Sequence, residues 1–226
     1  EKIEGENKPL FTLKEFQDQF VDVAVQDLTL GGQIYALPIY IDTLALYYNK
    51  DLFNTAGIAS PPRTWEEFND NVKRLVAFDS RGNISKAGAA IGTAKNINRS
   101  TDILTLFMLQ SGVKMVNDSQ SGATFAKSVD GVDVGETALQ YYTDFANPSK
   151  QVYTWNDGQH YSIDAFVNGD VAMTLNYSHH IKAIRDKAAR FNFGIAPVPQ
   201  IAGAQVAVNF ANYWAPTVSK QSKNQI

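Results

Sequence analysis

Residues 32–53 read GQIYALPIYIDTLALYYNKDLF, and this stretch indicates the fold most directly. Residues 34–40 are apolar and extended in pattern. Pro38 favours the edge of a sheet, because proline has no N–H to give to a neighbouring strand. A second apolar run, Ala45-Leu46-Tyr47-Tyr48, predicts another short strand. Residues 34–40 and 45–48 are therefore expected to be extended rather than helical.

Helix signals alternate with further strand signals on both sides of this stretch. Thr12-Leu13-Lys14-Glu15 and Thr64-Trp65-Glu66-Glu67 each have the spacing of a capping box, so each predicts a helix start. Further helices are predicted to begin at Ser100, Asp133, Ser162 and Ser178. Further strands are predicted at residues 87–91, 171–175, 193–196 and 206–210. This alternation predicts an α/β fold, with residues 45–208 forming a three-layer lobe around a mostly parallel sheet.

The composition excludes several classes of protein. The chain has 226 residues, 44% of them hydrophobic, which is enough for a sizeable core. Its formal charge of −3 and its scattered basic residues give no basic face for nucleic acid. It has no cysteine, so it forms no disulfide. No apolar run approaches the roughly 20 residues of a membrane span. The first residues, EKIEGE, are polar, so we expect no signal peptide within the chain.

No catalytic or metal-binding motif stands out. The sequence has no phosphate-binding glycine loop, no nucleophile elbow and no metalloprotease signature. The histidines are His160, His179 and His180, and neighbouring helix residues point about 100° apart, so His179 and His180 do not easily share a metal. We therefore expect no metal, no cofactor and no catalytic residue. A glycosidase would need paired carboxylates across a cleft, which the sequence cannot show.

Three segments carry a resemblance to a known family. Residues 32–53 with 61–68 (PPRTWEEF), residues 165–176 (AFVNGDVAMTLN) and residues 209–220 (NFANYWAPTVSK) occur in order and at matching spacing. They resemble the type 1 family of bacterial extracellular solute-binding proteins, the family of the maltose-binding protein. The resemblance covers nearly all of residues 12–224.

The resemblance implies a periplasmic-binding-protein-like (type II) fold, in which two lobes joined by hinge segments trap a ligand. Each lobe of that fold has three layers, α/β/α. In this chain, residues 1–40 and 213–226 would be partial stubs of a first lobe, because the family's outer segments are missing at both ends. Residues 41–44 and 209–212 would be the hinge segments, and residues 45–208 the second lobe.

The resemblance also implies a function without catalysis. The chain would be the extracellular substrate-binding component of an ABC-type uptake system, capturing a small polar solute such as a sugar or oligosaccharide. Its partner would be the membrane permease, its location periplasmic or extracellular, and the intact protein a monomer, with a lipid anchor on a missing N-terminus as one option. A ligand-binding sensor or scaffold of the same fold and a sugar-processing enzyme remain alternatives.

A sugar site needs planar hydrogen-bonding groups and flat aromatic surfaces. Asp42 follows an apolar strand, at the place where the family has an acidic ligand contact, and its carboxylate can accept two hydroxyl hydrogen bonds. Trp155 and Trp214 stand in polar surroundings and could stack on a sugar, whereas ordinary packing is the alternative for each. Tyr40 and Asn212 adjoin the proposed hinge crossings and complete this group.

A second group of candidates lies where a strand ends and a helix begins. Asn176, Tyr177 and His179 follow the strand predicted at 171–175, and ligands of α/β sheets collect at such ends. The family commonly has a tryptophan near this turn, so Tyr177 and His179 indicate a smaller or more polar ligand than a maltodextrin. Arg99 and Asp102 also flank a helix start and could contact polyol or acid groups, or belong to a surface loop.

Overall fold

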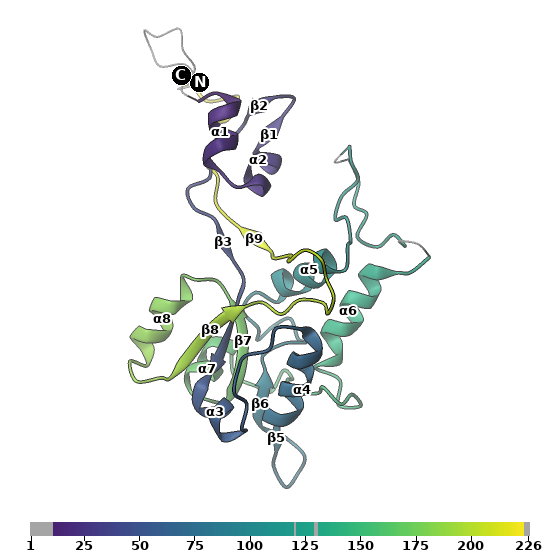
Figure 1. Cartoon of the computed structure of the whole chain (residues 1–226), viewed down its shortest axis with the longest axis vertical. Coiled ribbons are helices and arrows are strands. Elements are labelled where there is room, and N and C mark those ends of the chain that lie inside the picture. Colours follow the sequence, from purple (N-terminus) through teal and green to yellow (C-terminus); the bar gives the residue numbers. More distant parts are fainter. Residues whose placement is uncertain (1–10, 120, 129–130, 224–226) are drawn as a thin grey trace. The chain divides into compact units, whose positions relative to one another are not determined.

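The computed structural model describes residues 11–119, 121–128 and 131–223, and the chain divides into two compact units (Figure 1). Unit 1 comprises residues 1–42 and 211–226, and unit 2 comprises residues 43–210. The chain thus passes from one unit to the other within the segments 41–44 and 209–212. The role of these segments as hinges, and of the units as lobes, stays a prediction.

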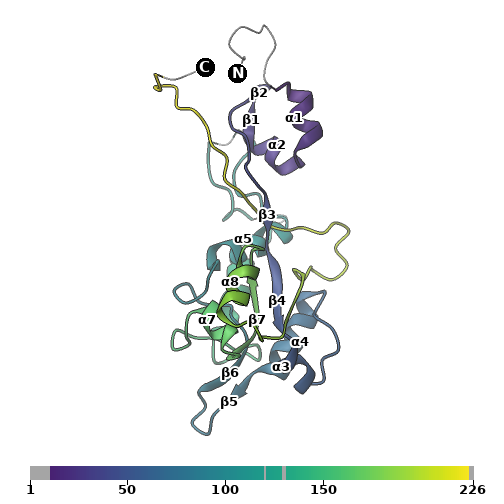
Figure 2. The same ribbon diagram turned by 90° about the vertical axis from the view of Figure 1, so that its left-hand side faces the viewer.

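Unit 2 is a three-layer α/β/α body. Its five-stranded sheet has the order β5-β6-β7-β4-β8. In the view of Figure 2, α7 and α8 lie on one side of β4 and β7, and α3 and α4 lie on the other. All six residues of β7 are buried, as expected for a strand covered on both faces. The elements are β4 (Ala45–Asn49), α3 (Lys50–Thr55), α4 (Trp65–Leu75), β5 (Ala77–Phe78), β6 (Ile84–Ala89), α5 (Ser100–Gln110), α6 (Val134–Asp144), α7 (Ser162–Val167), β7 (Val171–Asn176), α8 (His180–Lys187) and β8 (Phe193–Pro197).

The predicted α/β class is confirmed, but the prediction of a mostly parallel sheet is wrong. Within the described five-stranded sheet only β6 and β7 pair in parallel, whereas β4 is antiparallel to both β7 and β8, and β5 is antiparallel to β6. Strands β6, β7 and β8 do run in one direction, as helical crossovers predict. The first strand of the unit, β4, inserts between β7 and β8 and runs against them, which removes a second parallel pair.

Where the sequence predicted a helix, the observed start lies within a residue or two of the predicted one, whereas α3 was not predicted. Thr12 forms the full capping box of α1 (Leu13–Gln19), and Thr64 Oγ1 accepts a hydrogen bond from the backbone N–H of Glu67 at the start of α4. The apolar stripe of α4 faces the core as predicted. Ser100 and Ser178, by contrast, are not N-caps. The cap residues are Arg99 and His179, because the preceding loops bring the chain into each helix one residue away from the serine.

The strand predicted at 206–210 does not form. The backbone of Val208 is held instead by side-chain amides: its N–H donates to Gln200 Oε1 at 2.8 Å, and its carbonyl accepts from Gln200 Nε2 and Gln110 Nε2. These two amides replace the hydrogen bonds that a neighbouring strand would supply. A backbone whose polar groups are satisfied in this way needs no strand partner.

Unit 1 is small. Its described residues form two helices and a short hairpin, and a two-stranded ladder of β3 and β9 marks the point where the chain passes between the units. Ile39 N donates to Trp214 O at 3.0 Å, so the outgoing and returning segments run side by side within the unit. The Tyr213 hydroxyl donates to Asp27. Burial, together with this hydrogen bond and the charge of Asp27, raises the pKa of Tyr213 well above its usual value. The elements are α1 (Leu13–Gln19), α2 (Asp22–Leu28), β1 (Thr29–Leu30), β2 (Gln33–Ile34), β3 (Asp42–Thr43) and β9 (Ala211–Asn212).

Thr154 connects the loop after α6 to the sheet through its hydroxyl group, and loss of this hydroxyl should measurably lower the free energy of unfolding. Its buried Oγ1 accepts from the backbone N–H of Gly88 at 2.6 Å and lies 3.3 Å from that of Ala89. The isosteric change Thr154→Val leaves these donors unsatisfied, so we expect the free energy of unfolding to fall by about 2 kcal/mol. Urea unfolding followed by circular dichroism measures it.

Thr105→Val is the matched control for Thr154→Val. Thr105 stands on α5, its hydroxyl donates to Thr101 O near the surface, and its loss should change the free energy of unfolding by less than about 0.5 kcal/mol. Equal effects of the two substitutions would contradict the role given to Thr154.

Candidate functional site

Loops that follow the only parallel pair of strands within the described sheet build a polar surface in unit 2. The chain leaves the carboxyl end of β6 through residues 90–99 and the carboxyl end of β7 through residues 177–179. Ala89 pairs with Met173 in parallel strands, so both loops leave the sheet at the same end of the strands. The carboxyl ends of parallel strands are where α/β sheets commonly bind ligands. We call the surface formed here by Asn98, Arg99, Asp102, Tyr161 and His179 the polar wall.

Asn98 joins three segments of the polar wall. Its side-chain Oδ1 accepts from Asn176 Nδ2 at 3.2 Å, and its Nδ2 donates to the Tyr161 hydroxyl at 2.7 Å. Its backbone N–H donates to Ser162 Oγ at 2.9 Å. These contacts tie the loop after β6 to the end of β7 and to the start of α7. The position of Asn98 is therefore set by partners more than 60 residues away in sequence.

Tyr177 organises the charged part of the polar wall. Its hydroxyl donates to Asp102 Oδ2 at 2.8 Å, and the Arg99 guanidinium carbon lies 5.0 Å from its ring centroid. The His179 ring is nearly parallel to the Tyr177 ring at 5.9 Å, and Arg99 Nη2 lies 3.4 Å from His179 Nε2. Such a distance between cation and ring is typical of a cation–π contact. The buried Tyr177 side chain thus contacts the carboxylate of Asp102, the guanidinium of Arg99 and the imidazole of His179.

The structure buries three of the candidate site residues in unit 2. Trp155 is fully buried, and its indole Nε1 donates to Asn96 Oδ1 at 3.0 Å, so it is a core residue rather than a stacking surface. Asn176 and Tyr177 are also fully buried. Both support the polar wall from behind through Asn98 and Asp102, because their side chains complete the core beneath it. Arg99, Asp102 and His179 keep exposed atoms and do lie together.

The remaining candidates belong to unit 1. Tyr40 is 47% exposed and Trp214 is 71% exposed, whereas Asp42 and Asn212 are half-buried members of β3 and β9. Within unit 1 the backbone around Tyr40 and that around Trp214 run side by side. Their contribution to ligand binding stays a prediction.

Sequence reasoning missed Asn98 and Tyr161 as members of the polar wall. Asn98 lay in the segment singled out before α5, but nothing local distinguished it from its neighbours. Tyr161 precedes Ser162 and is 43% exposed in the structure. Only the contact between positions 63 residues apart brings the two together. The local signal available in the sequence was an aromatic residue, Tyr161, directly before a predicted helix start.

The polar wall suits hydroxyl-rich solutes rather than metal ions. Among the described residues, no group of three or more histidines, cysteines or carboxylates is placed to hold a metal ion. The polar wall offers an amide, a guanidinium, a carboxylate, a phenol and an imidazole, which together can donate to and accept from hydroxyl groups.

In the described part of the chain, no helix has both the length and the apolar character to cross a membrane.

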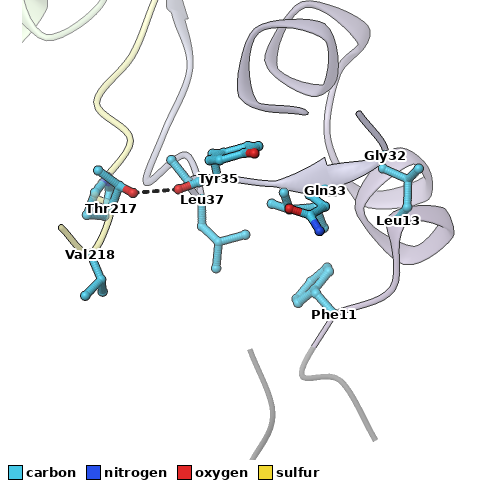
Figure 3. Close-up of a pocket in the computed structure, with 11 residues that line it drawn as sticks. Phe11, Leu13, Gly32, Gln33, Tyr35, Leu37, Thr217 and Val218 are labelled. Atoms are coloured by element: carbon cyan, nitrogen blue, oxygen red, sulfur yellow. Dashed lines mark hydrogen bonds between the residues drawn. The ribbon is translucent and has the colours of Figure 1, made fainter. Parts of the chain in front are cut away.

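A cavity in unit 1 differs in chemistry from the polar wall. It has a volume of about 630 Å³ and is lined mainly by apolar residues, including Phe11, Leu13, Leu37 and Val218 (Figure 3). The Thr217 hydroxyl at its rim already donates to Tyr35 O at 2.6 Å. None of the candidate site residues lines this cavity. Its few polar groups do not match a sugar, so we place the candidate site at the polar wall instead.

Comparisons with known proteins identify relatives of this chain. A Brucella abortus protein, named only as a binding protein, is 26% identical over 82% of this chain and 42% of its own length. The sn-glycerol-3-phosphate-binding periplasmic protein UgpB of Escherichia coli is 28% identical over 78% of this chain and 38% of its own length. The chain therefore spans about two fifths of these relatives.

A solved structure shares the fold. It is an ABC transporter solute-binding protein from Thermotoga lettingae bound with α-D-tagatose, with a TM-score of 0.69 and 24% identity over 94% of this chain and 53% of that one. The family model described as bacterial extracellular solute-binding protein matches residues 6–225. Nearly the whole chain is thus covered by one family model, in agreement with the motifs in residues 32–68, 165–176 and 209–220. The chain belongs to the bacterial extracellular solute-binding protein family.

Proposed function

We propose that this protein captures a small polar solute, a sugar or a polyol derivative, for an ABC-type uptake system, and that the polar wall of unit 2 contacts the solute. Membership of the solute-binding family supports the role. The observation that carries the choice of site is the convergence of polar side chains from three separate segments at the carboxyl ends of β6 and β7.

The chemistry of the polar wall supports a hydroxyl-bearing solute. The Tyr161 hydroxyl oxygen accepts from Asn98 Nδ2, which leaves its own proton available for a solute oxygen. Asp102 supplies acceptor oxygens, and Arg99 and His179 supply ring or guanidinium nitrogens. A few converging polar groups of this kind fix the orientation of a small ligand.

The relatives support the same class of ligand. One is named for sn-glycerol 3-phosphate, and one neighbouring structure contains α-D-tagatose. Both ligands are small and rich in oxygen. For the whole protein we further propose a location outside the cytoplasm, a permease as partner, a monomeric state and release of the solute unchanged. A lipid anchor stays a prediction, which metabolic labelling with a radioactive fatty acid would test.

A thermal-shift screen of the protein at its full natural length tests the proposal. Probes are tagatose, maltose, mannobiose and sn-glycerol 3-phosphate, with spermidine as a ligand of different chemistry. A solute that binds only the folded protein at 100 times its Kd stabilises it by about 2.7 kcal/mol. We expect a sugar or polyol derivative to raise the unfolding temperature, and chromatography of the incubated solute to show no product. Stabilisation by spermidine alone would contradict the proposal.

Tyr161→Phe then tests the site. This substitution removes one hydroxyl from a side chain that is 43% exposed, so we expect about tenfold weaker binding by calorimetric titration, or about 1.4 kcal/mol, with little change in stability. Tyr153→Phe is the matched control, because the Tyr153 hydroxyl also accepts from an asparagine amide, that of Asn156 at 2.8 Å, yet lies outside the polar wall. Equal affinities of the two variants would move the site elsewhere.

A further inference from the structure

Arg99 lacks a counter-charge from the protein. Among the described residues no carboxylate lies within ion-pair distance of its guanidinium. Its Nε is buried and has no hydrogen-bond partner, and the distance of 3.4 Å between Nη2 and His179 Nε2 is long for a hydrogen bond. Two other arginines differ in this respect: Arg74 donates to two backbone carbonyls, and Arg81 pairs with Asp79. A partly buried cation without a counter-charge costs free energy that a bound anion would offset.

The backbone of Arg99 is also strained. Its φ of 72° and ψ of 26° lie in the left-handed region, and among the described residues it is the one non-glycine with positive φ. A side chain in this region costs roughly 1 kcal/mol or more, whereas glycine adopts it freely. Glycine occupies the other described positions of positive φ. The arginine side chain must therefore contribute something that glycine would not, and the structure shows no ion pair that would explain it.

The acid of the polar wall does not fill this need. Asp102 Oδ2 accepts from the Tyr177 hydroxyl at 2.8 Å, and Oδ1 accepts from the Thr101 hydroxyl at 3.1 Å. Each carboxylate oxygen of Asp102 is thus directed to a hydroxyl group, while the guanidinium rests on the face of the Tyr177 ring. Stacking on an aromatic ring holds the planar guanidinium in place and leaves its edge for a bidentate acceptor.

We propose that Arg99 binds an anionic oxygen group of the solute, a carboxylate or a phosphate, and that the solute is an acidic or phosphorylated sugar or polyol. This inference rests on the proposed function, because it takes the polar wall as the solute site. His179 stands beside the guanidinium, with its Nε2 at 3.4 Å from Arg99 Nη2. Neutral sugars would leave the Arg99 cation unpaired and would bind more weakly for that reason.

Calorimetric titration of the full-length protein with matched pairs of probes tests this inference. The carboxylate arm compares D-glucuronate with D-glucose, the phosphate arm compares sn-glycerol 3-phosphate with glycerol, and inorganic phosphate is titrated alone. We expect one charged probe to bind at least about a hundredfold more tightly than its neutral partner, with affinity falling as salt rises. The arm that responds identifies the anion as carboxylate or phosphate.

Arg99→Gly is the decisive variant, because glycine relieves the strain and should not lower the unfolding temperature. We expect it to abolish the preference for the charged probe, and Arg99→Lys to restore part of it. Arg81→Gly, on an exposed turn, is the matched control and should leave the preference unchanged.

The outcomes separate this inference from the proposed function. Neutral sugars binding as tightly as their acids, with Tyr161→Phe weakening both and Arg99→Gly neither, would overturn the anion site and leave the proposed function intact. A charged preference that survives Arg99→Gly would also overturn the anion site. Absence of binding by every probe to the unaltered protein would overturn both.

Discussion

Replacement of Trp155 by alanine is expected to destabilise unit 2 by about 3–5 kcal/mol, the usual cost of deleting a large aromatic side chain from a core. Trp155 is fully buried, and its Nε1 donates to Asn96 Oδ1 at 3.0 Å. Asn96 in turn donates from Nδ2 to the carbonyls of Asn156 and Gln159, at 2.9 and 3.0 Å. The substitution would leave a cavity and remove one of the hydrogen bonds that hold this amide.

Trp214→Ala is the control, since the Trp214 side chain is 71% exposed and its loss should cost less than about 1 kcal/mol. Urea unfolding followed by far-ultraviolet circular dichroism compares the variants without relying on tryptophan fluorescence. A cost below about 1 kcal/mol for Trp155→Ala would show that Trp155 is not a core residue, and the surface role considered from the sequence would return.

Replacement of Gly88 by alanine should be nearly as damaging, for the opposite reason. A Cβ at position 88 would lie 2.7 Å from the backbone oxygen of Val72, 2.9 Å from the Val72 Cα and 3.2 Å from Thr154 Oγ1. Two of these contacts are with backbone atoms of helix α4, so relief requires α4 and β6 to move apart. We expect a loss of about 2–3 kcal/mol, in the range of overpacked cores.

Gly122→Ala is the matched control for Gly88→Ala. A Cβ there would meet only the end of the Asn117 side chain, at 3.7 Å, and the φ of Gly122 is not positive. Its effect on the free energy of unfolding should stay within about 0.5 kcal/mol. Unfolding midpoints that are the same for both variants would mean that α4 does not pack directly on β6.

These expectations separate packing from ligand contact. Trp155 and Gly88 should change stability strongly, and their effect on ligand affinity should follow only from partial unfolding. Tyr161 and Arg99 should change affinity with little effect on stability. Affinity and unfolding measured on the same four variants therefore distinguish the core of unit 2 from the polar wall.

The sequence by itself determined the local elements and the family. Capping residues such as Thr12 and Thr64 and the apolar stripe of α4 predicted helices, because a helix is stabilised by contacts within a few residues. The motifs in residues 32–53, 165–176 and 209–220 pointed to the solute-binding family, and the family model agrees. Asn98 and Tyr161 were beyond reach, because their shared hydrogen bond joins positions far apart in the chain.

Only the tertiary structure decided the direction of the strands and the faces of the side chains. Alternating strands and helices predicted parallel neighbours, but the insertion of β4 between β7 and β8 left a single parallel pair in the sheet. Trp155 stands in a polar stretch of sequence and is nevertheless fully buried, because Asn96, from a loop 59 residues away, satisfies its N–H. Strand order and burial depend on which distant segments meet, and the free energy of those contacts is not encoded in any local pattern.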